Sequence, residues 1–335
     1  MGCSVPDQGI QLGYKLSSEE FSAPELVRQA CAAEEHGFSF AMISDHYHPW
    51  TSRQGQSPFV WSVIGGIASS TRKLMVGTGV TCPTFRIHPA IVAQAAATSA
   101  TMMPGRFFLG VGTGENLNEH IVGERWPEVE VRQHRLAEAI EIMRRLWEGK
   151  QVSFHGQHFH VENTRLYSLP DRTPDLMIAA AGPRSIDLAA QLGDGLIATA
   201  PDADLVRRFQ RNGGLGKPCY GELNVCFDQN ERRAQELAHA IWPLAGLPGQ
   251  LLPELPAPAH FEKAAEMISR DKIASTVICG PDPDQHLNAI AEYAKAGFDH
   301  VFVHQIGPNQ EAFMDFYARE VLPRLSLGMT EKQAA

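Results

Sequence analysis

Three residues that could carry out acid–base chemistry, Asp45, His46 and Trp50, stand directly after an apolar segment at residues 38–44. A histidine exchanges a proton near neutral pH, and a neighbouring carboxylate can orient the ring and favour its charged form. A tryptophan beside it offers an apolar face and one N–H donor. The group predicts an acid–base site. The alternative is a structural turn in which Asp45 caps and Trp50 packs.

A glycine-rich turn, Gly110-Val-Gly-Thr-Gly-Glu115, ends in a carboxylate. It departs from the dinucleotide-binding pattern G-x-G-x-x-G, because Glu115 stands where the third glycine would be. Glycines also let a backbone approach a ligand closely, and we expect Glu115 to project toward that ligand. The alternative is a tight turn between a strand and a loop.

A third segment, Ala179-Ala-Ala-Gly-Pro183, precedes a helical pattern at residues 185–192. The unpaired N–H groups at the start of a helix suit a phosphate or another anion. A small-residue turn that serves packing is the alternative interpretation.

These segments are separated by short apolar runs that alternate with amphipathic helical patterns. Strands are expected at 10–16, 38–44, 74–80, 107–112, 176–181, 195–199, 220–226 and 300–304. Helices are expected at 24–36, 89–102, 134–147, 185–192, 231–241, 285–296 and 310–325. Such alternation predicts parallel strands with right-handed crossovers, and eight strands in 335 residues fit a closed (β/α)8 TIM barrel.

We therefore predict a single elaborated α/β barrel over residues 1–335, with a hairpin insertion near 151–168 and a second insertion near 246–270. In such barrels the chemistry lies at the carboxyl ends of the strands. His46 and Glu115 follow adjacent strands, so we expect them to face each other across the mouth of the barrel.

Composition excludes several functional classes. With 44% hydrophobic and 20% charged residues, the chain is typical of a globular protein rather than a disordered or fibrous one. A net charge of −9 without clustered Lys and Arg argues against nucleic-acid binding. We find neither an apolar run of ~18 residues nor a secretory leader, so we expect no membrane contact and a cytoplasmic protein.

The cysteine and histidine patterns indicate no metal site. Six cysteines are scattered without a C-x-x-C pair, which is typical of thiols in a reducing compartment. His155, His158 and His160 lie close in sequence, but His155 and His158 would face opposite sides of a strand, and no further ligand pattern completes a site.

Together the segments resemble the bacterial luciferase-like α/β-barrel superfamily, and within it the coenzyme F420-dependent branch of the F420-dependent glucose-6-phosphate dehydrogenase family. The resemblance covers nearly the whole chain and is densest up to about residue 200. It is carried by Ser44-Asp-His-Tyr-His-Pro-Trp50, Pro83-Thr-Phe-Arg86, His88-Pro-Ala-Ile-Val-Ala-Gln94, Phe108-Leu-Gly-Val-Gly-Thr-Gly-Glu115, Leu117-Asn-Glu119, Trp126-Pro-Glu128, Arg144-Arg-Leu-Trp147 and Gly193-Asp-Gly195.

The resemblance implies coenzyme F420 as cofactor and hydride transfer between an alcohol or sugar and its deazaflavin ring. His46 would take the proton of the substrate hydroxyl, and Glu115 would protonate the ring or stabilise the charge formed there. Asp45 would lie beside both the histidine and the ring, and Trp50 would line the reaction site. Cofactor contacts are implied at Asp45, Gly79, Val80, Thr113, Gly114, Asn118, Ala181, Gly182 and Thr199, with a non-proline cis peptide between Gly79 and Val80.

The implied substrate pocket contains Trp50 and departs from the family at three positions. Asp202, about Leu252 and about Thr276 stand where the glucose-6-phosphate enzymes place cations against the sugar phosphate. A phosphate dianion needs such charges to offset its lost hydration. These residues predict a neutral or partly hydrophobic alcohol as substrate.

Three other functions stay open at this point. One is a flavin (FMN)-dependent luciferase-like monooxygenase, and another is a non-catalytic deazaflavin carrier or sensor. The third is an F420-dependent glucose-6-phosphate dehydrogenase with a rearranged phosphate site, in which Lys263, Arg270 or Lys272 compensates. The family and the apolar helical runs at 59–68 and 91–103 also imply a homodimer.

Overall fold

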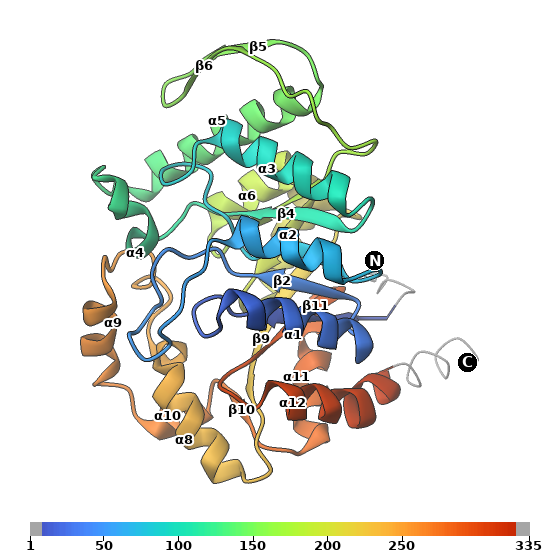
Figure 1. Ribbon diagram of the computed structural model, residues 1–335. Coiled ribbons are helices and arrows are strands. Elements are labelled where there is room, and N and C mark those ends of the chain that lie inside the picture. Colours follow the sequence, from blue (N-terminus) through green and yellow to red (C-terminus); the bar gives the residue numbers. More distant parts are fainter. Residues whose placement is uncertain (1–8, 326–335) are drawn as a thin grey trace.

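Eight parallel strands form a closed barrel in the computed structural model, which describes residues 9–325 (Figure 1). The ring closes because β8 pairs with β9 and β11 pairs with β1. In order around the barrel the strands are β1 (Gln11–Leu16), β2 (Phe40–Ile43), β3 (Met75–Thr78), β4 (Phe107–Val111), β7 (Asp175–Ala179), β8 (Gly195–Ala198), β9 (Cys219–Cys226) and β11 (His300–Gln305). The predicted TIM barrel is confirmed.

The helices that surround the barrel bury their apolar faces against the outer side of the strands (Figure 1). They are α1 (Ala23–Glu35), α2 (Val60–Ser70), α3 (Pro89–Met102), α5 (Val129–Trp147), α6 (Pro183–Leu192), α7 (Ala203–Phe209), α8 (Glu231–Ile241), α11 (Pro283–Ala296) and α12 (Gln310–Phe316). The helix expected at 310–325 contains a π turn, η4 (Tyr317–Val321), directly after α12.

The two expected insertions contain further elements. The first holds the antiparallel hairpin of β5 (Val152–His155) and β6 (His160–Thr164), which projects beyond α5 in Figure 1. The second holds α9 (Pro258–Ala265) between the short helices η3 (Pro243–Gly246) and α10 (Arg270–Ala274). The remaining short elements are α4 (Asn116–Glu119), η1 (His120–Val122), η2 (Gln210–Gly214) and β10 (Ile278–Cys279), which pairs with β9 outside the ring.

Large side chains fill the middle of the barrel. Phe40, Phe108, Tyr220 and Phe302 form a buried cluster with neighbouring Met and Ile side chains. A Cβ atom added at Gly77 would lie 2.1 Å from the ring of Phe108, so this strand needs a glycine to admit the ring. All four aromatic residues stand in the first half of their strands, on the amino-terminal side of the loops that carry the polar site.

Candidate active site

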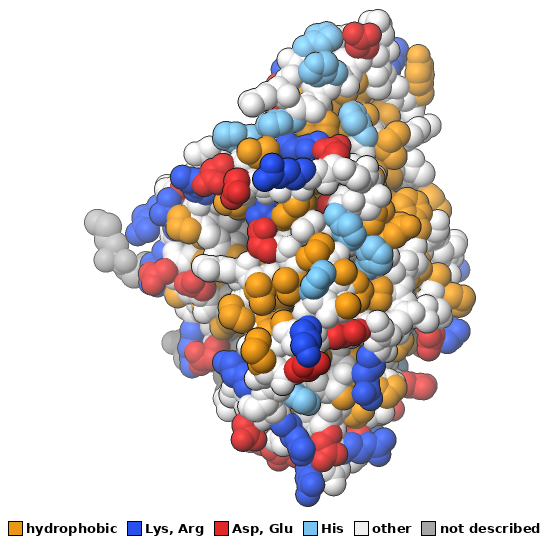
Figure 2. Space-filling view, turned by 90° about the vertical axis from the view of Figure 1, so that its left-hand side faces the viewer, with side chains coloured by type: hydrophobic (Ala, Val, Ile, Leu, Met, Phe, Trp, Pro, Cys, Tyr) orange, Lys and Arg blue, Asp and Glu red, His pale blue; other side chains and the backbone are white. Residues whose placement is uncertain are grey.

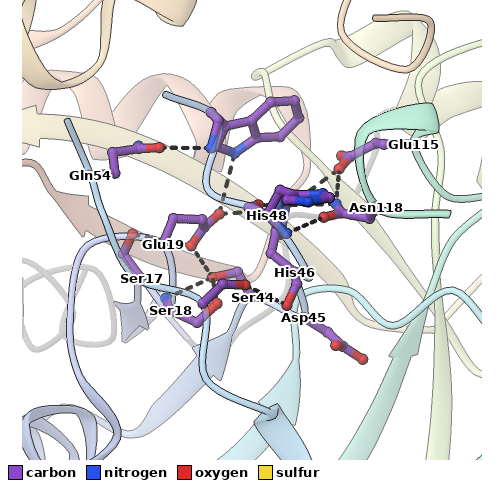
Figure 3. A network of polar contacts seen from close by, with 12 residues as sticks. Ser17, Ser18, Glu19, Ser44, Asp45, His46, His48, Gln54, Glu115 and Asn118 are labelled. Carbon is purple, nitrogen blue, oxygen red and sulfur yellow. Dashed lines mark hydrogen bonds and ion pairs between the residues drawn. The ribbon is translucent and has the colours of Figure 1, made fainter. Parts of the chain in front are cut away.

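His46 lies at the carboxyl end of β2, with its side chain only 9% exposed, between two carboxylates (Figure 3). Its Nε2 atom is 3.4 Å from Oε1 of Glu19 and 3.5 Å from Oε2 of Glu115. Nδ1 is 3.1 Å from both the main-chain oxygen of His48 and Nδ2 of Asn118, so it can donate to the first or accept from the second. His46 and Glu115 therefore meet across the mouth as expected, but their strands are not adjacent: β3 lies between β2 and β4.

Glu19 comes from the loop after β1, and its side chain is 1% exposed. It accepts hydrogen bonds from Nε1 of Trp50 at 3.2 Å and from the hydroxyl groups of Ser17 and Ser44. Burial alone would raise the pKa of Glu19, but attraction by His46 and Lys15 and the bond from Ser44 outweigh it and lower the pKa to about 2. Glu19 is thus a permanently charged neighbour of His46.

Glu115 has the opposite character, although 32% of its side chain is exposed. Loss of hydration raises the pKa of Glu115; His46 opposes this shift, and the charge of Glu19 reinforces it. Its Oε2 atom accepts a hydrogen bond from Nδ2 of Asn118 at 2.9 Å. The two carboxylates beside one imidazole are therefore biased toward different protonation states, which is how acid and base roles are separated in one site.

Asn118, on the short helix α4, holds the loop that follows β2 against the loop that follows β4. Its side-chain oxygen accepts from the main-chain N–H groups of Tyr47 at 2.9 Å and His48 at 3.2 Å. These bonds direct its amide N–H group toward Glu115 and His46. Asn118 therefore sets the relative position of the base and the acid.

Asp45 points away from His46, contrary to the expectation that this carboxylate would lie beside the ring and orient it. Its oxygens accept from Oγ1 of Thr81 at 2.7 Å and from Nη2 of Arg86 at 2.8 Å. Within residues 9–325, no hydrogen bond or ion pair joins its side chain to His46. Consecutive side chains in extended backbone face opposite sides, so neighbours in sequence rarely share one site.

Glu19 was missed by the sequence analysis, although a signal existed. The run Ser17-Ser18-Glu19-Glu20 follows the first strand and places two carboxylates and two hydroxyl groups at the carboxyl end of the barrel. Although Asp45 is adjacent to His46 in sequence, the carboxylate beside the imidazole is Glu19, which follows a different strand.

The residues expected to hold the cofactor follow five neighbouring strands: Asp45 follows β2, and the others lie at or beyond the carboxyl ends of β3, β4, β7 and β8. The peptide between Gly79 and Val80 is cis, as the resemblance implied. A Cβ atom at Gly112 would lie 2.8 Å from Val80, whereas one at Gly182 would meet nothing within 4 Å. Thr113 and Gly114 are partly exposed, and Ala181 and Thr199 are exposed. Small side chains and bare backbone thus leave room for a ligand, which fits the expected group.

The four residues expected in the substrate pocket separate into two pairs. Trp50 packs against Phe261 at a ring distance of 5.1 Å, and Leu252 contacts the same apolar cluster. Asp202 is exposed and accepts from the first N–H groups of α7, while Oγ1 of Thr276 donates to the main-chain oxygen of Ile273 at 3.1 Å. Trp50 and Leu252 therefore supply an apolar wall, whereas Asp202 and Thr276 form hydrogen bonds with backbone groups at the ends of helices.

The segment around Leu252 lies against α4. The main-chain N–H of Asn116 donates to the oxygen of Pro253 at 2.9 Å, and its side chain donates to the oxygen of Glu254 at 3.0 Å. Arg132, 5% exposed, forms a 2.7 Å ion pair with Glu254. Figure 2 views the molecule from the side of α4 and α9 and shows apolar and histidine side chains across the middle of this face.

Among residues 9–325 there is no group of three or more His, Cys, Asp or Glu side chains that could hold a metal ion. No helix in the same range is long and apolar enough to cross a membrane.

Comparisons with known proteins agree with the family resemblance of the sequence motifs. Residues 8–300 match the family model of the luciferase-like monooxygenases. F420-dependent glucose-6-phosphate dehydrogenases from Nakamurella multipartita and Mycobacterium tuberculosis are each 35% identical to this chain, over 94% of its length and 96% and 98% of theirs.

Solved structures agree with the sequence matches. An F420-dependent secondary alcohol dehydrogenase in complex with an F420–acetone adduct superposes with a TM-score of 0.88 at 30% identity, covering 95% of this chain and 99% of the other. The F420-dependent tetrahydromethanopterin reductase from Methanopyrus kandleri shares the fold, with a TM-score of 0.77 at 20% identity over 95% of this chain and 99% of that one. The chain therefore belongs to the luciferase-like monooxygenase family and, within it, to the F420-dependent dehydrogenases.

Proposed function

We propose that this protein is an F420-dependent dehydrogenase that transfers hydride between a neutral alcohol and the deazaflavin, with His46 as base and Glu115 as acid. The observation that carries the proposal is the position of His46 Nε2 between Glu19 and Glu115, beside the small-residue ends of four strands. The names of the relatives, which include glucose-6-phosphate and secondary alcohol dehydrogenases, support the reaction class.

The cofactor would be held by Gly79, Val80, Thr113, Gly114, Asn118, Ala181, Gly182 and Thr199. When bound, the deazaflavin supplies the hydride acceptor; the protein supplies orientation and proton transfer. Asp45 is fixed by Thr81 and Arg86 next to the peptide that follows β3. Its role is to hold this loop in shape beneath the cofactor-binding residues.

His46 would take the proton of the substrate hydroxyl at Nε2. When Nδ1–H donates to the main-chain oxygen of His48, Nε2 carries the free lone pair that a base requires. The charged Glu19 then stabilises the imidazolium that forms. Glu115, whose pKa is raised by burial, holds a proton more readily than an ordinary carboxyl group and would give it to the reacting centre.

The substrate that this pocket favours is a neutral or partly hydrophobic alcohol. Trp50, Leu252 and Phe261 provide apolar contacts. Two of the cations that the rearranged phosphate site would need are paired with other residues: Lys263 pairs with Glu266 at 2.7 Å and Arg270 with Glu236 at 3.2 Å. Sugar phosphates are therefore expected to be poor substrates.

Spectroscopy tests the cofactor, and turnover tests the substrate. We expect F420, but not FMN, to give a binding difference spectrum, and secondary alcohols to bleach F420 absorbance faster than glucose 6-phosphate. Binding of FMN alone would favour a flavin monooxygenase. Rapid turnover of glucose 6-phosphate at micromolar KM would show a rearranged phosphate site, and full activity of an H46A/E115A double variant would refute the assigned roles.

We also propose a homodimer in the cytoplasm. Phe59, Ile91 and Met102, at the start of α2 and on α3, are 57%, 55% and 47% exposed, which is unusual for large apolar side chains. The five cysteines in the described range are free thiols, in keeping with a reducing compartment. Light scattering should give twice the chain mass of 36.8 kDa, and Ile91→Glu should reduce it to that of the monomer.

A further inference from the structure

Two consecutive carboxylates, Glu19 and Glu20, face two different histidines. Oε1 of Glu19 is 3.4 Å from Nε2 of His46, and Oε1 of Glu20 is 3.1 Å from Nε2 of His304 on β11. The side chains of Glu20 and His304 are 5% and 0% exposed. A second acid–base pair thus lies buried beside the first, and the proposed chemistry does not use it.

The hydroxyl group of Ser17 stands between the two pairs. Its Oγ atom is 3.2 Å from Oε2 of Glu19 and 3.2 Å from Oε1 of Glu20. A serine has one hydroxyl hydrogen, so it can donate fully to only one of the two carboxylates at a time. The hydroxyl group donates to whichever carboxylate has its negative charge less neutralised by other partners.

The geometry around His304 requires a proton between it and Glu20. Nδ1 of His304 is 2.9 Å from Oδ1 of Asn224, an acceptor, so Nδ1 carries a hydrogen. In a neutral ring Nε2 would then present a lone pair to the Glu20 carboxylate at 3.1 Å, which is repulsive. Either His304 is an imidazolium or Glu20 is a carboxylic acid.

The other groups that face this pair are few. Lys15 on β1 forms a 2.6 Å ion pair with Glu222 on β9, and Glu222 is 3.8 Å from Nδ1 of His304. The ring of Trp242 packs edge-on against His304 at 4.6 Å. The main-chain N–H of Gly307 donates to Glu20 at 3.0 Å. Glu19, His46 and Glu115 are further ionisable groups at this end of the barrel.

We propose that Glu20 and His304 are positioning residues for His46: the proton they share directs the Ser17 hydroxyl to Glu19, and loss of that proton redirects it to Glu20. When the proton is present, the Glu20–His304 pair is neutral overall and Ser17 supports the charged Glu19. When it is lost, a second negative charge appears beside Glu19, and His46 holds a proton more strongly. This inference rests on the proposed function only for its effect on turnover.

The test is an NMR titration of the two imidazole rings in the protein without cofactor, in wild type and in Glu20→Gln. In Glu20→Gln we expect the His304 ring to release its proton at a lower pH than in wild type, because its anionic partner is gone. The His46 titration should move in the same direction by a smaller amount. Glu35→Gln, an equal change of charge at an exposed position of α1, should move neither curve.

A second variant removes the bridge and leaves both carboxylates in place. In Ser17→Ala the His46 curve should lose the part of its pH response that coincides with the His304 titration. The coupling is wrong if Glu20→Gln moves only His304 or neither ring, or if Ser17→Ala leaves the His46 curve unchanged. With F420 and an alcohol, the acid limb of kcat/KM should shift in Glu20→Gln; if no turnover occurs at all, the proposed function fails while the titration still decides the coupling.

Discussion

Nε2 of His46 and Oε1 of Glu19 lie 3.4 Å apart, and neither side chain is more than a tenth exposed. In this environment a charge is tolerated only with partners, and Glu19 has three hydrogen-bond donors besides the ring. The low pKa of Glu19, about 2, keeps it ionised at any pH at which the enzyme would work. A proton that reaches His46 is therefore stabilised at the moment when it arrives.

Replacing Glu19 by glutamine should weaken the base without removing it. The amide retains the shape of the carboxylate but not its charge, so the imidazolium of His46 loses its anionic partner. We expect kcat/KM for alcohol oxidation to fall by roughly ten- to a hundredfold, less than the 10²–10⁴-fold that a positioned base contributes in full, because His46 itself stays in place. Steady-state kinetics with F420 would measure it; an unchanged kcat/KM would contradict the role of Glu19.

Glu119 should make the protein less stable as the pH rises. Burial raises the pKa of Glu119 from its ordinary value of 4.5 to about 7, despite the opposing charge of Arg86. Between these values the folded protein holds a proton that the unfolded chain has released, so the free energy of unfolding falls with increasing pH, by about 1–3 kcal/mol in total. In Glu119→Gln, urea unfolding at pH 5 and pH 8 should show a smaller difference than in wild type.

An equal slope in Glu119→Gln and wild type would rule out this assignment. Glu35→Gln is the matched control, because Glu35 is exposed and should leave the slope unaltered.

Gly114 should tolerate no side chain because there is no space for one. Gly123, which has a similar backbone conformation but open space around it, serves as the control that separates crowding from backbone strain. Gly114 and Gly123 both have positive φ, +82° and +80°, so alanine costs each of them about 1 kcal/mol. A Cβ atom at Gly114 would also lie 2.5 Å from Sγ of Cys82, whereas one at Gly123 meets nothing within 4 Å.

We therefore expect Gly114→Ala to lower the free energy of unfolding by about 1–3 kcal/mol more than Gly123→Ala, and to weaken F420 binding. Urea titration and F420 fluorescence would measure the two effects. Equal behaviour of the two variants would mean that the loop after β4 moves freely away from Cys82.

Glu254 should hold the segment before α9 against the rest of the barrel. Glu254 forms an ion pair with Arg132, whose side chain is only 5% exposed. Glu254→Ala leaves this buried charge without its carboxylate, so we expect a loss of about 1–3 kcal/mol in the free energy of unfolding and faster proteolysis between residues 247 and 257. Glu266→Ala removes an exposed pair with Lys263 and should change stability by less than about 1 kcal/mol. Identical cleavage rates in both variants would show that the ion pair between Glu254 and Arg132 does not hold this segment in place.

The barrel itself was predictable because its information is local and repeated. Alternating apolar strands and amphipathic helices specify parallel strands, and the residues that follow strands β2 and β4 had to meet at one end of a closed barrel. The meeting of His46 and Glu115 follows from that geometry alone. The cis peptide at Gly79–Val80 and the cofactor-binding rim came from motif resemblance rather than from spacing.

The partner of His46 was decided only by the tertiary structure. Side-chain direction at the end of a strand depends on the backbone of the loop, which turns Asp45 toward Arg86 and leaves the ring to Glu19 from a different strand. The same holds for Glu20 and His304, which are distant in sequence and meet because β1 and β11 are neighbours where the barrel closes. The sequence determined which strands are followed by residues that can act as acid or base. The closure of the barrel and the conformation of the loops determined which of these side chains touch.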